Sequence, residues 1–135
     1  MAKLNVQMNG DVYQTIERSI AYMLGHLNER IKVVDLARMA NLSAAHFTAL
    51  FKQKTGHPPI NFIIRLRMHQ ACHLLKINNL SVREIAATLG YKDPFFFSRQ
   101  FKMIHGVAPK NYRMLETNVV PFISRISVPV TAPDF

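Results

Sequence analysis

The chain has 135 residues and a basic composition, with 17 Lys and Arg against 8 Asp and Glu and a net charge of +9. This length suits one compact domain or two very small ones, and it excludes a large multidomain enzyme. The charge favours an anionic partner, either nucleic acid or an acidic membrane surface. Cys72 has no second cysteine to pair with, which excludes an internal disulfide and fits a reducing compartment.

The N-terminal part of the chain predicts a loose segment followed by a helix. Residues 1–10 are expected to form a flexible N-terminus. The apolar spacing of VYQTIERSIAYMLGHL then predicts a helix that packs on the next helical unit of the chain. No apolar run reaches the length of a signal peptide or of a membrane span. We therefore expect a soluble, cytoplasmic protein that does not bind membranes.

A repeat with an offset of fifty residues dominates the rest of the sequence. The stretch SAAHFTALFKQKTGHPPINF, residues 43–62, returns as DPFFFSRQFKMIHGVAPKNY, residues 93–112. The upstream pieces VVDLARMANL and VREIAATLGY also match, with one extra residue before the second helix of the later copy. A duplicated unit of two helices explains this pattern. The identical pairs are Phe47 and Phe97, Phe51 and Phe101, Lys52 and Lys102, Gly56 and Gly106, Pro59 and Pro109, and Asn61 and Asn111.

Helix start and stop signals predict a helix-turn-helix in each copy. Ser43 is an N-cap after the turn ANLS. In the later copy, Ser81 opens a capping-box pattern (S-x-x-E), Gly90 is a stop signal, and Asp93 before a proline is a second N-cap. Each unit is thus a short helix, a tight turn and a second helix. We assign residues 11–57 to the first subdomain and residues 79–115 to the second.

A long helix is predicted between the two copies, over residues 58–78. About 18 residues at a rise of 1.5 Å span roughly 27 Å, which is near the roughly 34 Å between successive major grooves on one face of DNA. Two recognition helices held this far apart can enter adjacent grooves, so a monomer is expected to suffice. From Leu36 to Arg83 every charged side chain is Lys or Arg, and the same holds from Pro94 to Leu115, which suits phosphate contact.

From about Asp11 to Met114 the sequence resembles the AraC/XylS family of bacterial transcription regulators. The most specific motif is IAATLGYKDPFFFSRQFKMIHGVAPKNYR, and LARMANLSAAHFTALFKQKTGHPPINFI and RLRMHQACHLL are also similar to the family pattern. The resemblance implies an all-α fold of about seven helices, with two helix-turn-helix subdomains joined by a long linker helix. It further implies binding to double-stranded promoter DNA and regulation of transcription, commonly activation. No cofactor is expected.

The resemblance also assigns residues to base contact. Thymine methyl groups suit Ala45 and Thr48, whereas Arg99 suits the O6 and N7 atoms of guanine. We therefore expect the second half-site to carry the sharper sequence preference. The implied base-reading positions are Ala44, Ala45, Thr48 and Ala49 in the first unit, and Phe95, Phe96 and Arg99 in the second.

Phosphate contacts are expected near the turns and helix ends that flank the grooves. For any single lysine, a solvated surface position is the alternative. The expected phosphate-contacting residues are Ser43, Lys52, Lys54, Arg65, Arg67, Ser81, Lys102 and Lys110.

Two further patterns can be explained by packing alone. His69, Cys72 and His73 lie on one predicted helix, but no fourth ligand is evident, so packing is expected and no metal. Phe95 and Phe96 fit packing against a neighbouring helix as well as base contact. A protein-binding patch, with RNA polymerase as a candidate partner, is a third interpretation.

No enzymatic activity is expected, because the sequence has no nucleophile elbow, phosphate loop or paired metal motif. The alternative function is a basic helical module that binds an acidic protein or a membrane surface. A membrane-surface helix needs one continuous basic amphipathic face, whereas caps and turns interrupt this chain. The family often adds a sensing domain, so the chain is either a stand-alone regulator or the DNA-binding piece of a longer protein. Residues 116–135 form a proline-containing tail beyond the resemblance.

Overall fold

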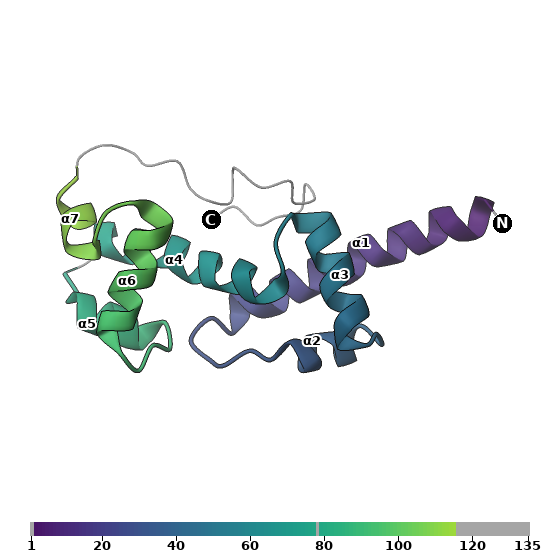
Figure 1. The fold of residues 1–135 in the computed structure, drawn as a ribbon, viewed down its shortest axis with the longest axis horizontal. Helices are drawn as coiled ribbons and strands as arrows, with labels where there is room; N and C mark the ends of the chain where they lie inside the picture. Colours follow the sequence, from purple (N-terminus) through teal and green to yellow (C-terminus); the bar gives the residue numbers. More distant parts are fainter. Residues whose placement is uncertain (1, 78, 116–135) are drawn as a thin grey trace.

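The computed structural model describes residues 2–77 and 79–115, with side chains from Asp11 onward. Over these residues the regular secondary structure is all α-helix, without a strand, which confirms the expected all-α fold with two helix-turn-helix subdomains joined by a long helix. The predicted tail, residues 116–135, lies outside the described residues. The helices are α1 (Ala2–Gly25), α2 (Val33–Met39), α3 (Ala44–Thr55), α4 (Pro59–Ile77), α5 (Val82–Thr88), α6 (Pro94–His105) and α7 (Pro109–Met114) (Figure 1).

Helix α1 differs from the expectation at its start. It begins at Ala2, so the backbone of residues 2–10, expected to be flexible, is helical. The flexibility itself stays a prediction, since helical backbone alone does not decide how rigid a segment is. Further along, Ile16, Ile20 and Met23 lie three or four residues apart and are buried. This apolar stripe is the face by which α1 packs on the first unit.

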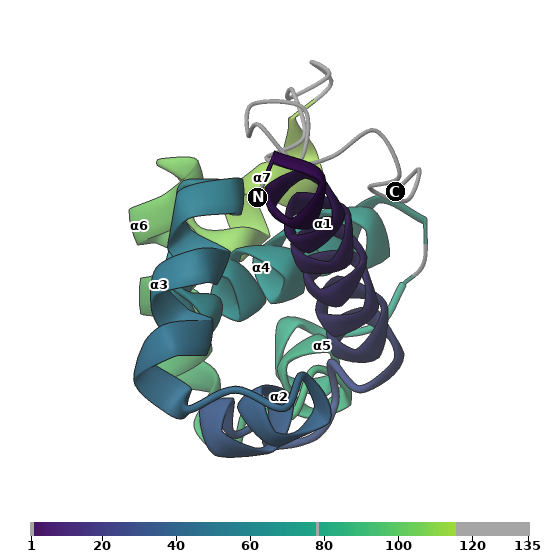
Figure 2. The same ribbon diagram turned by 90° about the vertical axis from the view of Figure 1, so that its right-hand side faces the viewer.

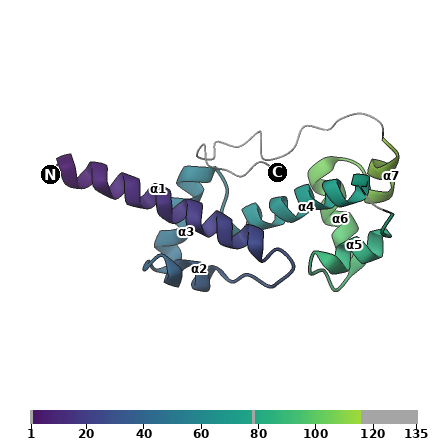
Figure 3. The same cartoon turned by 180° about the vertical axis from the view of Figure 1, so that it is seen from behind.

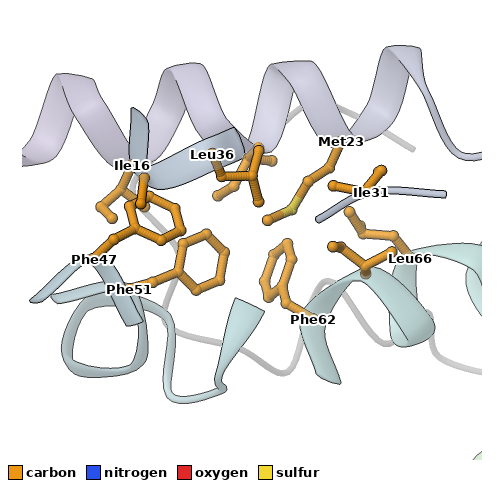
Figure 4. Close-up of a cluster of buried hydrophobic side chains, with 11 residues drawn as sticks. Ile16, Met23, Ile31, Leu36, Phe47, Phe51, Phe62 and Leu66 are labelled. Atoms are coloured by element: carbon orange, nitrogen blue, oxygen red, sulfur yellow. The ribbon is translucent and has the colours of Figure 1, made fainter. Parts of the chain in front are cut away.

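The first core gathers side chains from α1 to α4. Phe47 and Phe51, one turn apart on α3, are fully buried there. Figure 4 shows how side chains from all four helices point toward one another around these two rings. The side chains labelled there are Ile16, Met23, Ile31, Leu36, Phe47, Phe51, Phe62 and Leu66.

Helix α4 belongs to both cores. Phe62 and Leu66, near its start, lie in the first cluster, whereas Met68, Ala71 and Leu75 lie in a second cluster with residues of α5, α6 and α7. The two subdomains therefore share α4, and each half of this helix contributes side chains to the core of one subdomain. Its 19 residues correspond to a length of about 28 Å.

The second unit repeats the packing of the first. Phe51 and Phe62 meet edge to face with ring centroids 5.2 Å apart, and Phe101 and Tyr112 do the same at 5.6 Å. Helices α3 and α6 have the same offset of fifty residues at both ends, and α4 and α7 begin at prolines with that offset. The sequence repeat is thus a repeat of three-dimensional packing.

The two second helices, α3 and α6, lie on the same side of the molecule. Both cross α4 steeply in Figure 1, and both lie along one edge in the view turned by 90° (Figure 2). Helix α1 covers the opposite side of the first unit, as the view from behind shows (Figure 3). None of the helices in the described part of the chain is long and apolar enough to cross a membrane.

Candidate nucleic-acid interface

The start of α3 is fixed by a turn and a side-chain cap. Asn41 adopts a left-handed conformation with φ 57°, which asparagine tolerates better than most residues. The Ser43 hydroxyl then accepts a hydrogen bond from the backbone N–H of His46 at 3.1 Å. The predicted cap is confirmed, and it satisfies one of the free N–H groups at the start of α3.

The start of α6 is fixed in a corresponding way. Gly90, with φ 87°, takes the left-handed position in the turn, and the Asp93 carboxylate accepts a hydrogen bond from the N–H of Phe95 at 2.9 Å. Before this turn, Ser81 and Glu84 form both hydrogen bonds of the predicted capping box. These hydrogen bonds hold the pKa of Glu84 below its usual range. Both carboxylates are thus directed to the ends of their own helices.

The outward face of α6 is largely apolar. Phe95 is 70% exposed, Met103 is 76% exposed and Phe96 is 46% exposed. Helical spacing puts them on one face with Arg99, and the Arg99 guanidinium lies 5.9 Å from the centre of the Phe96 ring. The structure therefore brings the predicted residues Phe95, Phe96 and Arg99 together. The interpretation of Phe95 as a packed side chain is not supported.

The outward face of α3 presents smaller side chains. Ala45 and Ala49 are exposed, and Thr48 is half-buried beside them. Ala44 differs from these three, because it is half-buried and packs against the first core. The structure therefore brings Ala45, Thr48 and Ala49 together on one surface and turns Ala44 partly inward.

Sequence reasoning missed three exposed residues on these faces. Met103 lies one turn beyond Arg99, and the fifty-residue offset pairs Met103 with Gln53 and Phe96 with His46. His46 and Gln53 are both exposed on α3, and their side chains carry donors and acceptors that the neighbouring alanines lack. The signal that would have found them was the offset itself, applied to every position of the exposed face.

The residues expected to contact phosphates fall into two groups. Lys52 and Lys102 are exposed on the outward faces of α3 and α6, and Lys110 is exposed at the start of α7. Lys54 lies over the ring of Tyr13, with Nζ 5.6 Å from its centre, and Arg65 is half-buried. The Ser43 and Ser81 hydroxyls accept hydrogen bonds from backbone N–H groups of their own helices.

Arg67 is placed differently from the expectation of a phosphate contact. Its Nε donates to the carbonyl oxygen of Leu27 at 2.9 Å, and its Nη2 donates to that of Glu29 at 2.6 Å. Both acceptors belong to the loop between α1 and α2. The guanidinium is therefore committed to contacts within the protein, a role that no local pattern in the sequence indicates.

Cys72 and His69 of α4 are partly or largely buried, whereas His73 is exposed. Cys72 is partly buried, with its Sγ 3.3 Å from Nε2 of His105, and burial raises the pKa of its thiol to about 11. His69 is buried, and this burial lowers its pKa, with a smaller effect from the neighbouring His105 and His73. Within residues 2–77 and 79–115, no three His, Cys, Asp or Glu side chains gather in a way that could hold a metal ion.

Comparison with known proteins identifies the same architecture. A family model described as a helix-turn-helix domain matches residues 36–114. The MmsAB operon regulatory protein of Pseudomonas aeruginosa is 39% identical over 93 residues, which are 69% of this chain and 30% of the relative. The transcriptional activator Btr of Bacillus subtilis is 36% identical over 66% of this chain and 17% of its own length. The chain thus spans less than a third of each of these two curated relatives.

Solved structures agree with the sequence relatives. The C-terminal domain of AraT, a response regulator from Geobacillus stearothermophilus, superposes with a TM-score of 0.71 at 28% identity, covering 78% of this chain and 88% of that one. The DNA-binding domain of the global transcriptional factor AdpA, crystallised with a target DNA, has a TM-score of 0.69 at 32% identity, covering 73% and 89%. The chain belongs to the AraC/XylS family of DNA-binding transcription regulators.

Proposed function

We propose that the chain binds promoter DNA sequence-specifically as a monomer, with α3 and α6 in adjacent major grooves. The observation that carries this proposal is the position of two capped recognition helices on one side of a 19-residue helix. The length of that helix, about 28 Å, is close to the groove spacing of roughly 34 Å. A single chain thereby presents what many DNA-binding proteins obtain by dimerising.

The proposed effect is activation of transcription. The Bacillus subtilis relative is named a transcriptional activator, which supports activation over repression for this chain. Activation requires contact with the transcription machinery, so RNA polymerase is the proposed protein partner. Promoter DNA places the proposed site of action in the bacterial cytoplasm.

For α6, we propose a mixed polar and apolar readout. Arg99 would donate to O6 and N7 of a guanine, which is the commonest specific arginine contact in the major groove. The Phe96 ring supports one side of the guanidinium and limits its freedom before binding. Phe95 and Met103, both more than two-thirds exposed, would contact thymine methyl groups.

For α3, we propose that specificity depends on more residues than the alanines. Ala45, Thr48 and Ala49 suit thymine methyls. Gln53 and His46, exposed on the same face, supply hydrogen bonds, and glutamine commonly pairs with N6 and N7 of adenine. The first half-site would therefore also carry sequence preference, although Arg99 still gives the second the stronger single contact.

The cations around these faces are proposed to contact phosphates. Lys52 and Lys102 occupy equivalent positions of α3 and α6, and both are exposed. Each phosphate contact releases a counterion, so binding should weaken steeply with salt. The remaining proposed phosphate contacts are Ser43, Lys54, Arg65, Ser81 and Lys110.

The test compares two neighbouring cations on α6. Arg99→Ala is expected to cost about 1–3 kcal/mol at one base pair and to remove the preference there. Lys102→Ala, one turn away, is expected to weaken all sequences alike and to lower the salt slope by about one. Fluorescence anisotropy with a panel of duplexes at several salt concentrations measures both effects.

The two variants separate the proposal from the non-specific alternative. If Arg99→Ala and Lys102→Ala both weaken every duplex equally, α6 does not distinguish bases. Salt-dependent binding without any sequence preference in the unaltered chain would leave only a basic module for anionic surfaces.

A further inference from the structure

The loop between α1 and α2, residues 26–32, lies against the second subdomain although it belongs to the first. It extends toward the turn between α5 and α6 in the front and rear views (Figures 1 and 3). Arg67 of α4 fixes this loop through the two hydrogen bonds to Leu27 and Glu29. A charged donor that binds two carbonyl groups restricts the loop more than a neutral contact does.

Gly90 contacts this loop directly. A Cβ atom built on Gly90 would lie 2.8 Å from the carbonyl oxygen of Asn28 and 3.1 Å from its carbonyl carbon. Gly56 and Gly106 have nearly the same φ, 84° and 82° against 87°, but a Cβ on either would meet nothing within 4 Å. The left-handed conformation is therefore common to the three glycines, and the close approach to a backbone is particular to Gly90.

Tyr91 extends the contact to the recognition helix. Its hydroxyl donates to Oε1 of Gln100 on α6 at 2.5 Å, and its ring packs edge to face on Phe97 at 5.2 Å. The same phenol interacts with the guanidinium of Arg67. A continuous chain of contacts thus runs from the first subdomain's loop through Arg67 and Tyr91 to α6.

We propose that Asn28, Arg67, Gly90 and Tyr91 form a clamp that fixes the orientation of the second subdomain relative to the first. Two small domains that share only one helix would be expected to move relative to each other, because a helix bends gently along its length. The clamp adds a second point of contact, away from the α4 axis, and so resists that bending. Its consequence, which rests on the proposed function, is that the clamp sets the half-site spacing that the chain accepts.

The direct test measures the orientation without DNA. Spin labels are placed at Arg38→Cys on α2 and Arg83→Cys on α5, both exposed, in a chain that carries Cys72→Ser. Pulsed electron resonance then gives the distribution of distances between the subdomains. A single narrow distribution is expected for the parent chain, and a broader or shifted one when Gly90→Ala forces the loop away.

The matched control is Gly106→Ala. Both substitutions put a side chain on a left-handed backbone and therefore carry the same conformational strain, but only Gly90→Ala meets the Asn28 carbonyl. Gly106→Ala should keep the narrow distribution. Arg67→Met and Tyr91→Phe, which remove donors without altering a left-handed residue, should broaden it and retain the test if Gly90→Ala fails to fold.

The second measurement concerns DNA. Insertion of one base pair between the half-sites should weaken the parent chain about tenfold, comparable to the loss of one good contact. The Gly90→Ala and Arg67→Met variants should lose clearly less, because their second subdomain can turn to follow the displaced groove. If the parent chain does not bind DNA at all, the proposed function is contradicted. The distance measurement needs no DNA, so it still tests the clamp.

Two results would overturn the clamp. One is a broad distance distribution in the parent chain. The other is an identical distribution in Gly90→Ala, Gly106→Ala and the parent chain, which would mean that α4 alone sets the orientation.

Discussion

At the scale of single residues, the outward faces of α3 and α6 combine apolar and polar groups in different proportions. Phe95 and Met103 leave large apolar surfaces in water on α6, whereas α3 exposes alanines beside Gln53 and His46. Contiguous exposed apolar side chains often mark a binding surface. In the proposed complex the partner of this surface is the row of thymine methyl groups in the major groove.

Replacement of thymine by uracil tests the role of Phe95. This change removes the C5-methyl group and leaves the hydrogen-bonding edge of the base intact. One lost methyl contact should weaken binding of the parent chain by about 0.8 kcal/mol, roughly fourfold. At the single thymine that Phe95 contacts, Phe95→Ala should bind the thymine and uracil duplexes equally, whereas replacement of a thymine contacted by another side chain should still weaken it. An equal loss in Phe95→Ala would show that this ring does not contact the methyl group.

His69 predicts a pH dependence of stability. Its folded pKa lies below the unfolded value of 6.5, chiefly because the imidazole is buried. The unfolded chain therefore binds the proton more readily, so the contribution of His69 is present above the unfolded pKa and is lost as the pH falls toward the folded pKa.

Denaturant titrations from about pH 7 to about pH 5 measure this slope. His69→Gln should reduce the fall in the free energy of unfolding. His46→Gln, which changes an exposed histidine on α3, should leave the fall unchanged. Equal slopes in the parent chain and His69→Gln would contradict the assignment to His69.

At the scale of elements, the local signals in the sequence predicted the helices and their caps well. Ser43, Ser81 and Asp93 are short-range caps, and a cap depends only on the next few residues. The repeat predicted the paired cores because the same aromatic positions recur. The destination of Arg67 could not be predicted, since its acceptors lie about forty residues away in the sequence. The face of α6 was only partly predicted, because a methionine is usually buried, whereas Met103 is 76% exposed.

The two separate cores predict separate local stabilities. Phe51 and Phe101 are fully buried in different clusters that share only α4. Phe101→Ala should cost about 3–5 kcal/mol, and native-state hydrogen exchange should show the loss in α5, α6 and α7 first. Phe51→Ala should instead affect α2 and α3. A uniform loss of protection across both units in either variant would mean that the subdomains unfold as one.

At the scale of the whole molecule, the basic charge and the geometry of the two units act together. The acidic residues Glu84 and Asp93 lie at the starts of α5 and α6, where they cap their own helices. Each half of the long helix α4 packs into a different core. This packing places α3 and α6 on the same side of one short chain (Figure 2). The proposed clamp then makes their separation a fixed property of the fold.

Selection of preferred duplexes from a random pool tests whether α3 and α6 bind adjacent major grooves at the same time. We expect two short preferred blocks whose centres lie about 10–10.5 base pairs apart, with the block contacted by α6 lost in Arg99→Ala. A single preferred block, or two blocks without a fixed spacing, would contradict simultaneous binding of α3 and α6 in adjacent grooves.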